Sequence, residues 1–132
     1  MIVLDASVMI AILDGADSHF KASQRLFVDH ATERLGAHRM TIAETLVRPA
    51  IAGRARAAAA ALAMLGIGQL DEPDDPVGLA ELRASTGLRL PDAVILNAAI
   101  RERARLATFD ERLARAAVEL GVTVVAVESN PV

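Results

Sequence analysis

The sequence contains no cysteine and very few aromatic residues. Its 132 residues include three Phe and neither Trp nor Tyr. Without cysteine, the protein has no disulfides, no thiolate metal ligands and no cysteine nucleophile. Because aromatic side chains are scarce, the core must be aliphatic, and a nucleic-acid surface built on stacked aromatic rings is not expected. Several common kinds of functional site are therefore excluded before any motif is considered.

Long apolar runs are also absent. No run reaches the length of a membrane span, and no basic stretch precedes an apolar one at the N-terminus, so we expect neither a membrane anchor nor a secretory signal. The composition, with 53% hydrophobic and 23% charged residues, is that of a globular protein. The sequence has no internal repeat and no linker. These features predict one domain over residues 1–132 and a cytoplasmic location.

The charge composition leaves nucleic-acid binding open. A net charge of −3 is not typical of proteins that bind nucleic acids. However, thirteen of the fourteen basic residues are Arg, which suits bidentate contacts with phosphate. A concentrated acidic metal site would account for part of the negative charge and leave the remaining surface closer to neutral.

Short apolar runs alternate with helical patterns along the chain. We expect strands at residues 2–4, 35–38, 67–70, 106–107 and 122–127, with helices between them. One of these helices begins at Thr41, and Pro49 is expected to interrupt or end it. This alternation predicts an α/β fold in which helices cover both faces of a parallel sheet.

Four acidic residues are placed where such a sheet brings them to one edge. Asp5 and Asp110 follow strands, whereas Glu44 and Asp92 lie in the first turns of helices. Right-handed crossovers put the carboxyl ends of strands and the amino ends of the following helices at the same edge. Ser7 is expected to cap the first helix, which would leave the Asp5 carboxylate free.

Each acid also has a purely structural interpretation, and Asp5 itself could cap the first helix. Glu44 matches the capping-box partner of Thr41. Asp92 suits the positive end of a helix dipole, a contribution of roughly 0.3–1 kcal/mol. Asp110 is a good N-cap for the last helix. Taken singly, the structural interpretation is at least as strong for Glu44, Asp92 and Asp110.

Taken together, the four acids indicate a metal site. Carboxylates that converge on one region repel and raise one another's pKa values. A hard divalent cation such as Mg²⁺ or Mn²⁺, which prefers oxygen ligands, would neutralise them. A carboxylate-bound metal with open water positions generates hydroxide and stabilises a pentacovalent phosphate. That chemistry is phosphodiester hydrolysis.

Four motifs carry a resemblance to a known family. They are Val3-Leu4-Asp5-Ala6-Ser7, Ala43-Glu44-Thr45-Leu46-Val47-Arg48-Pro49, Arg89-Leu90-Pro91-Asp92-Ala93 and Leu106-Ala107-Thr108-Phe109-Asp110. Each motif alone is weak, but their order and spacing span nearly the whole chain. The sequence resembles the PIN-domain ribonucleases, specifically the VapC-type toxins of bacterial toxin–antitoxin pairs.

The resemblance implies a PIN-like three-layer α/β/α fold with a five-stranded parallel sheet in the order 3-2-1-4-5. It also implies Mg²⁺-dependent (or Mn²⁺-dependent) endonucleolytic hydrolysis of RNA. Asp5 and Asp92 would be direct metal ligands, and Glu44 and Asp110 would complete the catalytic acidic cluster directly or through water. Ser7 and Thr108 would be hydroxyls that orient carboxylates or water.

The resemblance further implies protein partners. The apolar faces between Ser18 and Leu65 are expected to provide a groove for the C-terminal helix of a cognate VapB-type antitoxin and a homodimer surface. The toxin would then form a hetero-oligomer with that antitoxin. Arg48 and Arg89 are candidates for contacts with RNA phosphates, although a solvated helix face is the simpler explanation for each of them.

Two other functions remain as alternatives. A receiver or phosphatase-like phosphoryl-transfer protein also uses a strand-end Asp, but it needs a lysine near the phosphoryl group, and the only lysine is Lys21 in an early helix. The phosphatase pattern places a second Asp where this chain has Ser7. A catalytically silent PIN-fold binding module is the other alternative, and the intact set of four acids argues against it.

Several further polar residues have no assigned role at this stage. The three histidines, His19, His30 and His38, show no metal-ligand spacing and are interpreted as surface or strand-end residues. Asn97 occupies a helix position at which proteins of the resembled family often have a small or apolar residue.

Overall fold

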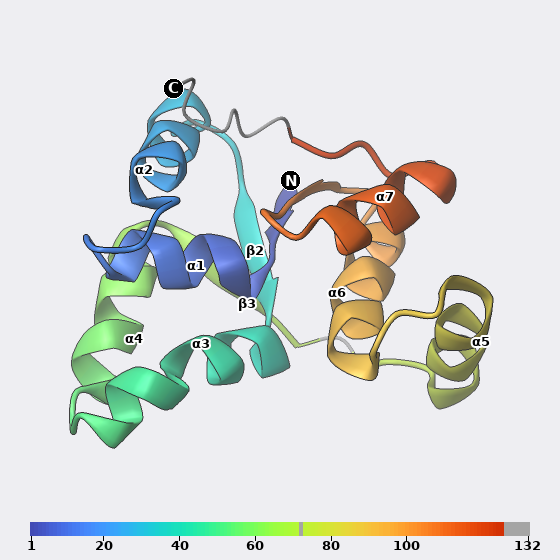
Figure 1. The fold of residues 1–132 in the computed structure, drawn as a ribbon, viewed down its shortest axis with the longest axis horizontal. Coiled ribbons are helices and arrows are strands. Elements are labelled where there is room, and N and C mark those ends of the chain that lie inside the picture. The colour runs from blue at the N-terminus through green and yellow to red at the C-terminus, as the bar shows by residue number, and fades with distance from the viewer. Residues whose placement is uncertain (72, 126–132) are drawn as a thin grey trace.

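Four short strands form the centre of the computed structural model, which describes residues 1–71 and 73–125. The strands are β1 (Ile2–Leu4), β2 (Leu35–His38), β3 (Ile67–Leu70) and β4 (Arg105–Ala107). The helices are α1 (Ala6–Leu13), α2 (Phe20–Asp29), α3 (Arg39–Ile51), α4 (Ala55–Met64), α5 (Pro76–Thr86), α6 (Leu90–Arg101) and α7 (Glu111–Glu119). Figure 1 shows α1 to α4 on one side of the sheet and α5 to α7 on the other.

All strand pairs in the sheet are parallel, and the strand order is β3-β2-β1-β4. The predicted order is therefore confirmed for these four strands. The predicted fifth strand at 122–127 is reduced, within the described residues, to a single parallel bridge between Leu106 and Val124. Residues 126 and 127 lie outside the described part of the chain. β1 lies between β2 and β4, so the residues that follow β1 and β4 are neighbours at one edge.

The core lies on both faces of the sheet, as the alternation of side chains along β1 requires. Val3 packs with Leu106 in the cluster that includes the buried residues of α6 and α7. Ile2 and Leu4 point to the opposite face and pack in the cluster that includes residues of α1, α2 and α4. All three β1 side chains are fully buried. The end of β1 is thus a rigid platform for the residue that follows it.

The predicted end of the third helix is wrong in detail. Pro49 lies inside α3, which continues to Ile51. Pro49 lacks the N–H that would donate to the carbonyl of Thr45, but the helix continues for two residues beyond it. The carbonyl of Pro49 accepts a hydrogen bond from the backbone N–H of Arg54 at 2.7 Å, which ties the helix end to the start of α4.

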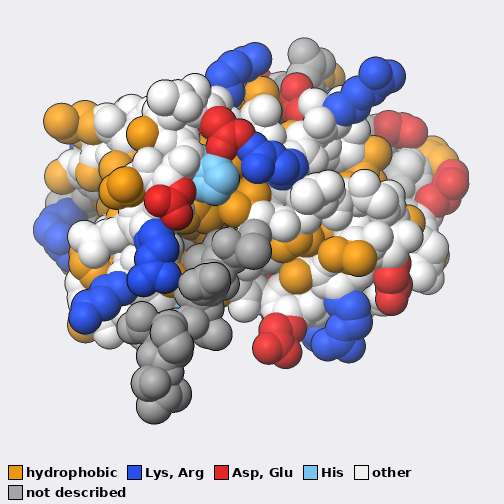
Figure 2. All heavy atoms as spheres, turned by 90° about the horizontal axis from the view of Figure 1, so that it is seen from above, with side chains coloured by type: hydrophobic (Ala, Val, Ile, Leu, Met, Phe, Trp, Pro, Cys, Tyr) orange, Lys and Arg blue, Asp and Glu red, His pale blue; other side chains and the backbone are white. Residues whose placement is uncertain are grey.

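At the edge where β1 begins, charged side chains are paired with opposite charges. Glu33 forms ion pairs with His30 and with Arg105. Figure 2, which views the molecule from above, shows acidic and basic side chains intermixed on this face. In the described ranges, 1–71 and 73–125, no helix has both the length and the apolar character that crossing a membrane would require.

Candidate active site

Asp5 follows β1 and is the N-cap of α1. Its Oδ1 accepts a hydrogen bond from the backbone N–H of Ala6 at 2.7 Å, and the residue is only 6% exposed. The prediction that Ser7 caps this helix is wrong. Ser7 lies inside α1 and donates its hydroxyl proton to Asp5 Oδ2 at 2.8 Å. The Asp5 carboxylate is therefore not free but held by its own helix.

A second set of hydrogen bonds joins the ends of β1 and β4. Thr108 donates its hydroxyl proton to Asp5 Oδ2 at 2.6 Å, and its Oγ1 accepts from the backbone N–H of Asp110 at 2.9 Å. The backbone N–H of Phe109 donates to Ser7 Oγ at 3.1 Å. Both hydroxyls thus fix the orientation of the Asp5 carboxylate and the path of the chain toward Asp110.

Asp110 is the N-cap of α7, so the structural interpretation of this residue is accurate. Its Oδ1 accepts from the backbone N–H groups of Arg112 and Leu113 at 2.9 and 3.3 Å. The cap leaves the negative charge in place, because the same carboxylate raises the pKa of Asp92. Asp110 therefore combines a structural role with an electrostatic contribution to the site.

The capping-box interpretation of Glu44 is wrong. The helix α3 begins at Arg39, and its N-cap is His38, whose Nδ1 accepts from the backbone N–H of Met40 at 3.1 Å. Glu44 is released from any capping role and is turned toward the other acids. Partial burial raises the pKa of Glu44, and the charges of Asp5 and Asp92 raise it further, against a smaller opposing effect of Arg89.

Asp92 lies in the first turn of α6, and its side chain is 17% exposed. Burial raises the pKa of Asp92, and the nearby carboxylates of Asp5 and Asp110 add to this. The positive charges of Arg89 and Arg112 lower the pKa of Asp92. The four acids predicted from sequence are therefore within electrostatic reach of one another, with Asp5 and Asp92 at the centre of the set.

The chemistry of these donors fits a hard divalent cation, because all of them are carboxylate oxygens and they repel one another. As the side chains stand, the part of the chain that the structure describes has no group of three or more His or acidic residues arranged as a ready-made metal site. Asp5 is fixed by its hydrogen bonds, so any such arrangement depends on rotations of the less constrained side chains.

The two arginines predicted to contact RNA occupy different positions. Arg89, whose side chain is 79% exposed, directly precedes α6, with its Nε 3.9 Å from Asp92 Oδ2. Arg48 instead lines a groove beside the acids. Sequence reasoning missed Arg112, which lowers the pKa of Asp92 from the first turn of α7. Its position two residues after Asp110 was the available signal.

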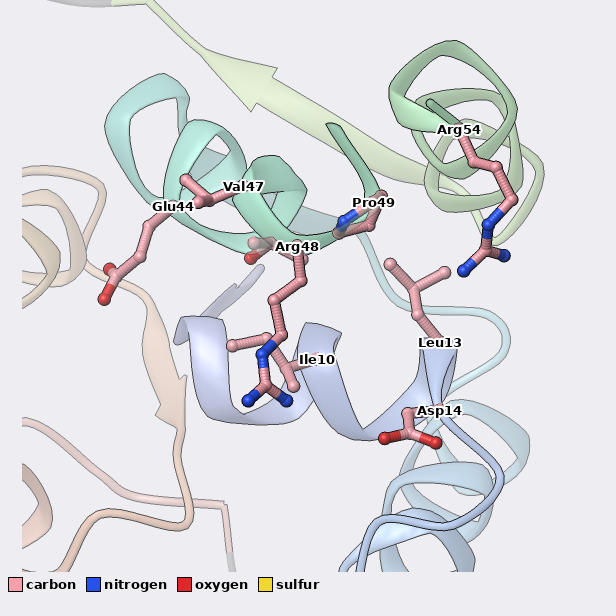
Figure 3. Close-up of a pocket in the computed structure, with 9 residues that line it drawn as sticks. Ile10, Leu13, Asp14, Glu44, Val47, Arg48, Pro49 and Arg54 are labelled. Carbon is pink, nitrogen blue, oxygen red and sulfur yellow. The ribbon is translucent and has the colours of Figure 1, made fainter. Parts of the chain in front are cut away.

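The groove of about 580 Å³ runs between α1 and the middle of α3. Figure 3 shows Ile10 and Leu13 on one wall and Val47, Arg48 and Pro49 on the other. Arg54 and Asp14 lie at one end, and Glu44 lies at the other with its carboxylate pointing away from Arg54. The apolar lining of the groove therefore extends to Glu44, one of the four acids.

A buried polar network beside the site was also missed. Because Nδ1 of His38 accepts from Met40, its Nε2 carries the proton and donates to Asp74 Oδ2 at 2.7 Å. Asp74 Oδ1 accepts from Asn97 Nδ2 at 3.2 Å and from Arg101 Nη1 at 3.1 Å. These residues are 23 to 36 positions from Asp74, and no local pattern connects them.

Comparison with known proteins gives one family match. The family model described as PIN domain matches residues 2–119, which is most of the chain. No curated protein matches the sequence.

Solved structures with the same fold include three from bacteria. A toxin–antitoxin complex from Klebsiella pneumoniae has a TM-score of 0.73 at 19% identity, covering 86% of this chain and 90% of that one. VapC20 from Mycobacterium tuberculosis, a toxin that cleaves the sarcin–ricin loop, has a TM-score of 0.68 at 16% identity and coverages of 88% and 95%. FitAcB from Neisseria gonorrhoeae has a TM-score of 0.66 at 19% identity and coverages of 96% and 97%.

Proposed function

The chain belongs to the PIN domain family, and we propose that it is a metal-dependent endoribonuclease acting as the toxin of a type II toxin–antitoxin pair. The observation that supports this most is the raised pKa of both Glu44 and Asp92, caused by burial and by the neighbouring acids. Carboxylates that lie close together repel one another, and a cation bound among them would offset this repulsion.

Mg²⁺ or Mn²⁺ would be held by Asp5 and Asp92, with Glu44 and Asp110 completing the set directly or through water. When bound, such an ion would supply the positive charge that activates a water molecule and stabilises a pentacovalent phosphate. Both ions prefer the all-oxygen donors that these residues offer.

The remaining steps fall to the side chains themselves. Ser7 and Thr108 keep the Asp5 carboxylate in one orientation through their hydrogen bonds to Oδ2. The raised pKa values of Glu44 and Asp92 suit either carboxylate to accept a proton from an attacking water. Arg89, at the edge of the set, would contact an RNA phosphate.

The test is RNA cleavage by the wild-type protein and by Asp5→Asn. We expect the wild type to cleave a structured RNA when Mg²⁺ or Mn²⁺ is added and not in EDTA. Asp5→Asn should lose more than about 100-fold in rate, since removing a residue that only orients a ligand already costs roughly 10–100-fold. The matched control is Glu119→Gln, which removes the same charge at the far end of α7 and should cleave as the wild type does.

The same proteins separate the alternatives. A phosphoacceptor would take up label from a small phosphodonor such as acetyl phosphate, and a silent binding module would neither cleave nor become labelled. Wild-type cleavage by Asp5→Asn, with folding verified by circular dichroism, would contradict the proposal.

We propose that the apolar groove between α1 and α3 receives an amphipathic helix of the cognate VapB-type antitoxin. An apolar floor flanked by Arg48 and Arg54 suits a helix with one apolar face and acidic neighbours. The resulting assembly would be a hetero-oligomer built on a toxin homodimer, acting in the cytoplasm.

The partner proposal is tested by co-expression with the small reading frame adjacent to the gene. Its product should suppress growth arrest by the wild type but not by Val47→Lys, because the lysine at this half-exposed groove position places a charge against the apolar face of the bound helix. Equal suppression of both would contradict the groove assignment.

A further inference from the structure

The carboxylates Glu44 and Asp92 lie on two helices, α3 and α6, that are separated by an open groove near the acids. The groove has a volume of about 460 Å³. Its apolar lining consists of Met40, Ala43 and Val47 from α3 and Leu90, Pro91 and Val94 from α6. Close packing normally fixes the distance between neighbouring helices. Direct packing between α3 and α6 is therefore limited beside the two carboxylates, although both helices also contact β2.

A hydrogen-bonded bridge spans the same two helices away from the groove. His38 is the N-cap of α3 through Nδ1 and donates to Asp74 through Nε2. Asp74 accepts from Asn97 and Arg101, both on α6. One carboxylate thus links the first residue before α3 to the second half of α6.

Stability alone does not account for the composition of this bridge. His38 is 4% exposed, so its ring is desolvated. The Nε and Nη2 atoms of Arg101 are buried without a hydrogen-bond partner among the residues that the structure describes, although Nε lies 3.8 Å from Glu102 Oε1. Buried donors without a hydrogen bond are costly, and an apolar contact would avoid that cost. A directional link between two helices is what a polar bridge provides and an apolar contact does not.

We propose that His38 and Asp74 are positioning residues: the His38–Asp74–Asn97/Arg101 bridge sets the spacing of Glu44 and Asp92 for divalent metal binding. None of these four residues contacts the acids, so they act through the placement of α3 and α6. This inference rests on the proposed metal-dependent function.

The test measures Mn²⁺ affinity by isothermal titration rather than activity. His38→Asn is the most informative variant, because Asn is a preferred N-cap residue but is too short to replace the Nε2 donor to Asp74. Asn97→Ala removes a single bond to Asp74 from the α6 side. Asp74→Ala removes the whole bridge. Folding of each variant is followed by circular dichroism.

Ser23→Ala is the matched control. The Ser23 hydroxyl is fully buried and donates to the carbonyl of Val8 at 3.0 Å, so its loss removes a buried hydrogen bond between α1 and α2. We expect the Mn²⁺ dissociation constant to rise roughly tenfold in His38→Asn and Asp74→Ala, less in Asn97→Ala, and less than about twofold in Ser23→Ala.

The outcomes separate the inference from the proposed function. Wild-type affinity in both His38→Asn and Asn97→Ala would overturn the positioning role even if Asp74→Ala fails to fold. An equal loss in Ser23→Ala would also overturn it, because the effect would then follow stability. A wild-type protein that does not bind Mn²⁺ would overturn the proposed function and this inference with it.

Discussion

Two carboxylates associated with α6, Asp74 and Asp92, are buried to the same degree, but their pKa values are shifted in opposite directions. Their side chains are 16% and 17% exposed. Burial works to raise the pKa of Asp74, but hydrogen bonds from His38, Asn97 and Arg101 outweigh it, so the pKa falls below its ordinary value. For Asp92, burial raises the pKa and neighbouring carboxylates raise it further.

The comparison teaches that neighbouring groups, and not burial, decide the direction in which the pKa of each of these acids is shifted. Asp74 is satisfied by donors that the chain itself supplies. Asp92 faces other acids, and two arginines compensate only in part. Glu33, at the opposite edge of the sheet, resembles Asp74, because His30 and Arg105 pair with it. Acids whose charges are only partly compensated thus occur where the resemblance predicts the metal site.

After Asp5→Asn, the largest effect is expected for Thr108→Val, which tests whether the Thr108 hydroxyl holds the Asp5 carboxylate in its orientation. The substitution keeps the shape of the side chain but removes the hydroxyl that donates to Asp5 and accepts from the N–H of Asp110. RNA cleavage should fall roughly 10–100-fold. The rate is measured at saturating Mg²⁺, and an unchanged rate would show that the orientation of Asp5 does not matter.

Asp74→Asn tests whether the charged Asp74 carboxylate stabilises the fold through its hydrogen bonds. It should lower the free energy of unfolding by about 1.5–3 kcal/mol at pH 7, because hydrogen bonds to a charged group are lost or weakened. Since the pKa of Asp74 in the folded protein lies below 3.8, its stabilisation is present above that pH and is lost as pH falls through the folded-state pKa.

Urea unfolding followed by circular dichroism measures this difference, since the chain has no Trp or Tyr for fluorescence. The gap between wild type and Asp74→Asn should close below about pH 3.8. A gap that stays constant with pH would contradict the charge-based explanation.

Asp92→Asn, measured in EDTA, tests whether the acids around Asp92 repel one another. It has the smallest expected effect, a rise in the free energy of unfolding of at most about 1 kcal/mol. Relief of repulsion exceeds the lost interaction with the dipole of α6. The pKa of Asp92 is raised, so its ionised form penalises folding above the folded-state pKa, and this penalty disappears as pH falls toward 3.8. The gain should therefore be present at pH 7 and absent at low pH; a loss of stability at pH 7 would contradict it.

The alternation of strands and helices predicted the parallel sheet and the edge at which the acids gather, whereas the strand order came from the resemblance to the family. Sequence reasoning failed where tertiary contacts decide between local options. Asp5 and Ser7 are both good N-cap residues, and Ser7 is instead occupied by the backbone of Phe109, 102 residues away. The bridge from His38 to Asp74 leaves no periodic signal at all.

The Thr41–Glu44 capping box illustrates the same limit. The four residues match the pattern, yet α3 starts at Arg39 because His38, at the end of β2, provides the cap. A histidine cap depends on a ring orientation that its bond to Asp74 fixes, and a local motif cannot contain that information.

The central claim is that the acids at the end of β1 repel one another until a cation binds. The most direct measurement is the free energy of unfolding of wild type and Asp92→Asn, each in EDTA and with Mn²⁺ at about 100 times the wild-type dissociation constant. Mn²⁺ should stabilise the wild type by about 2.7 kcal/mol and the variant much less, so that the order of stability reverses. If Mn²⁺ stabilises neither protein, or both equally, the claim is contradicted.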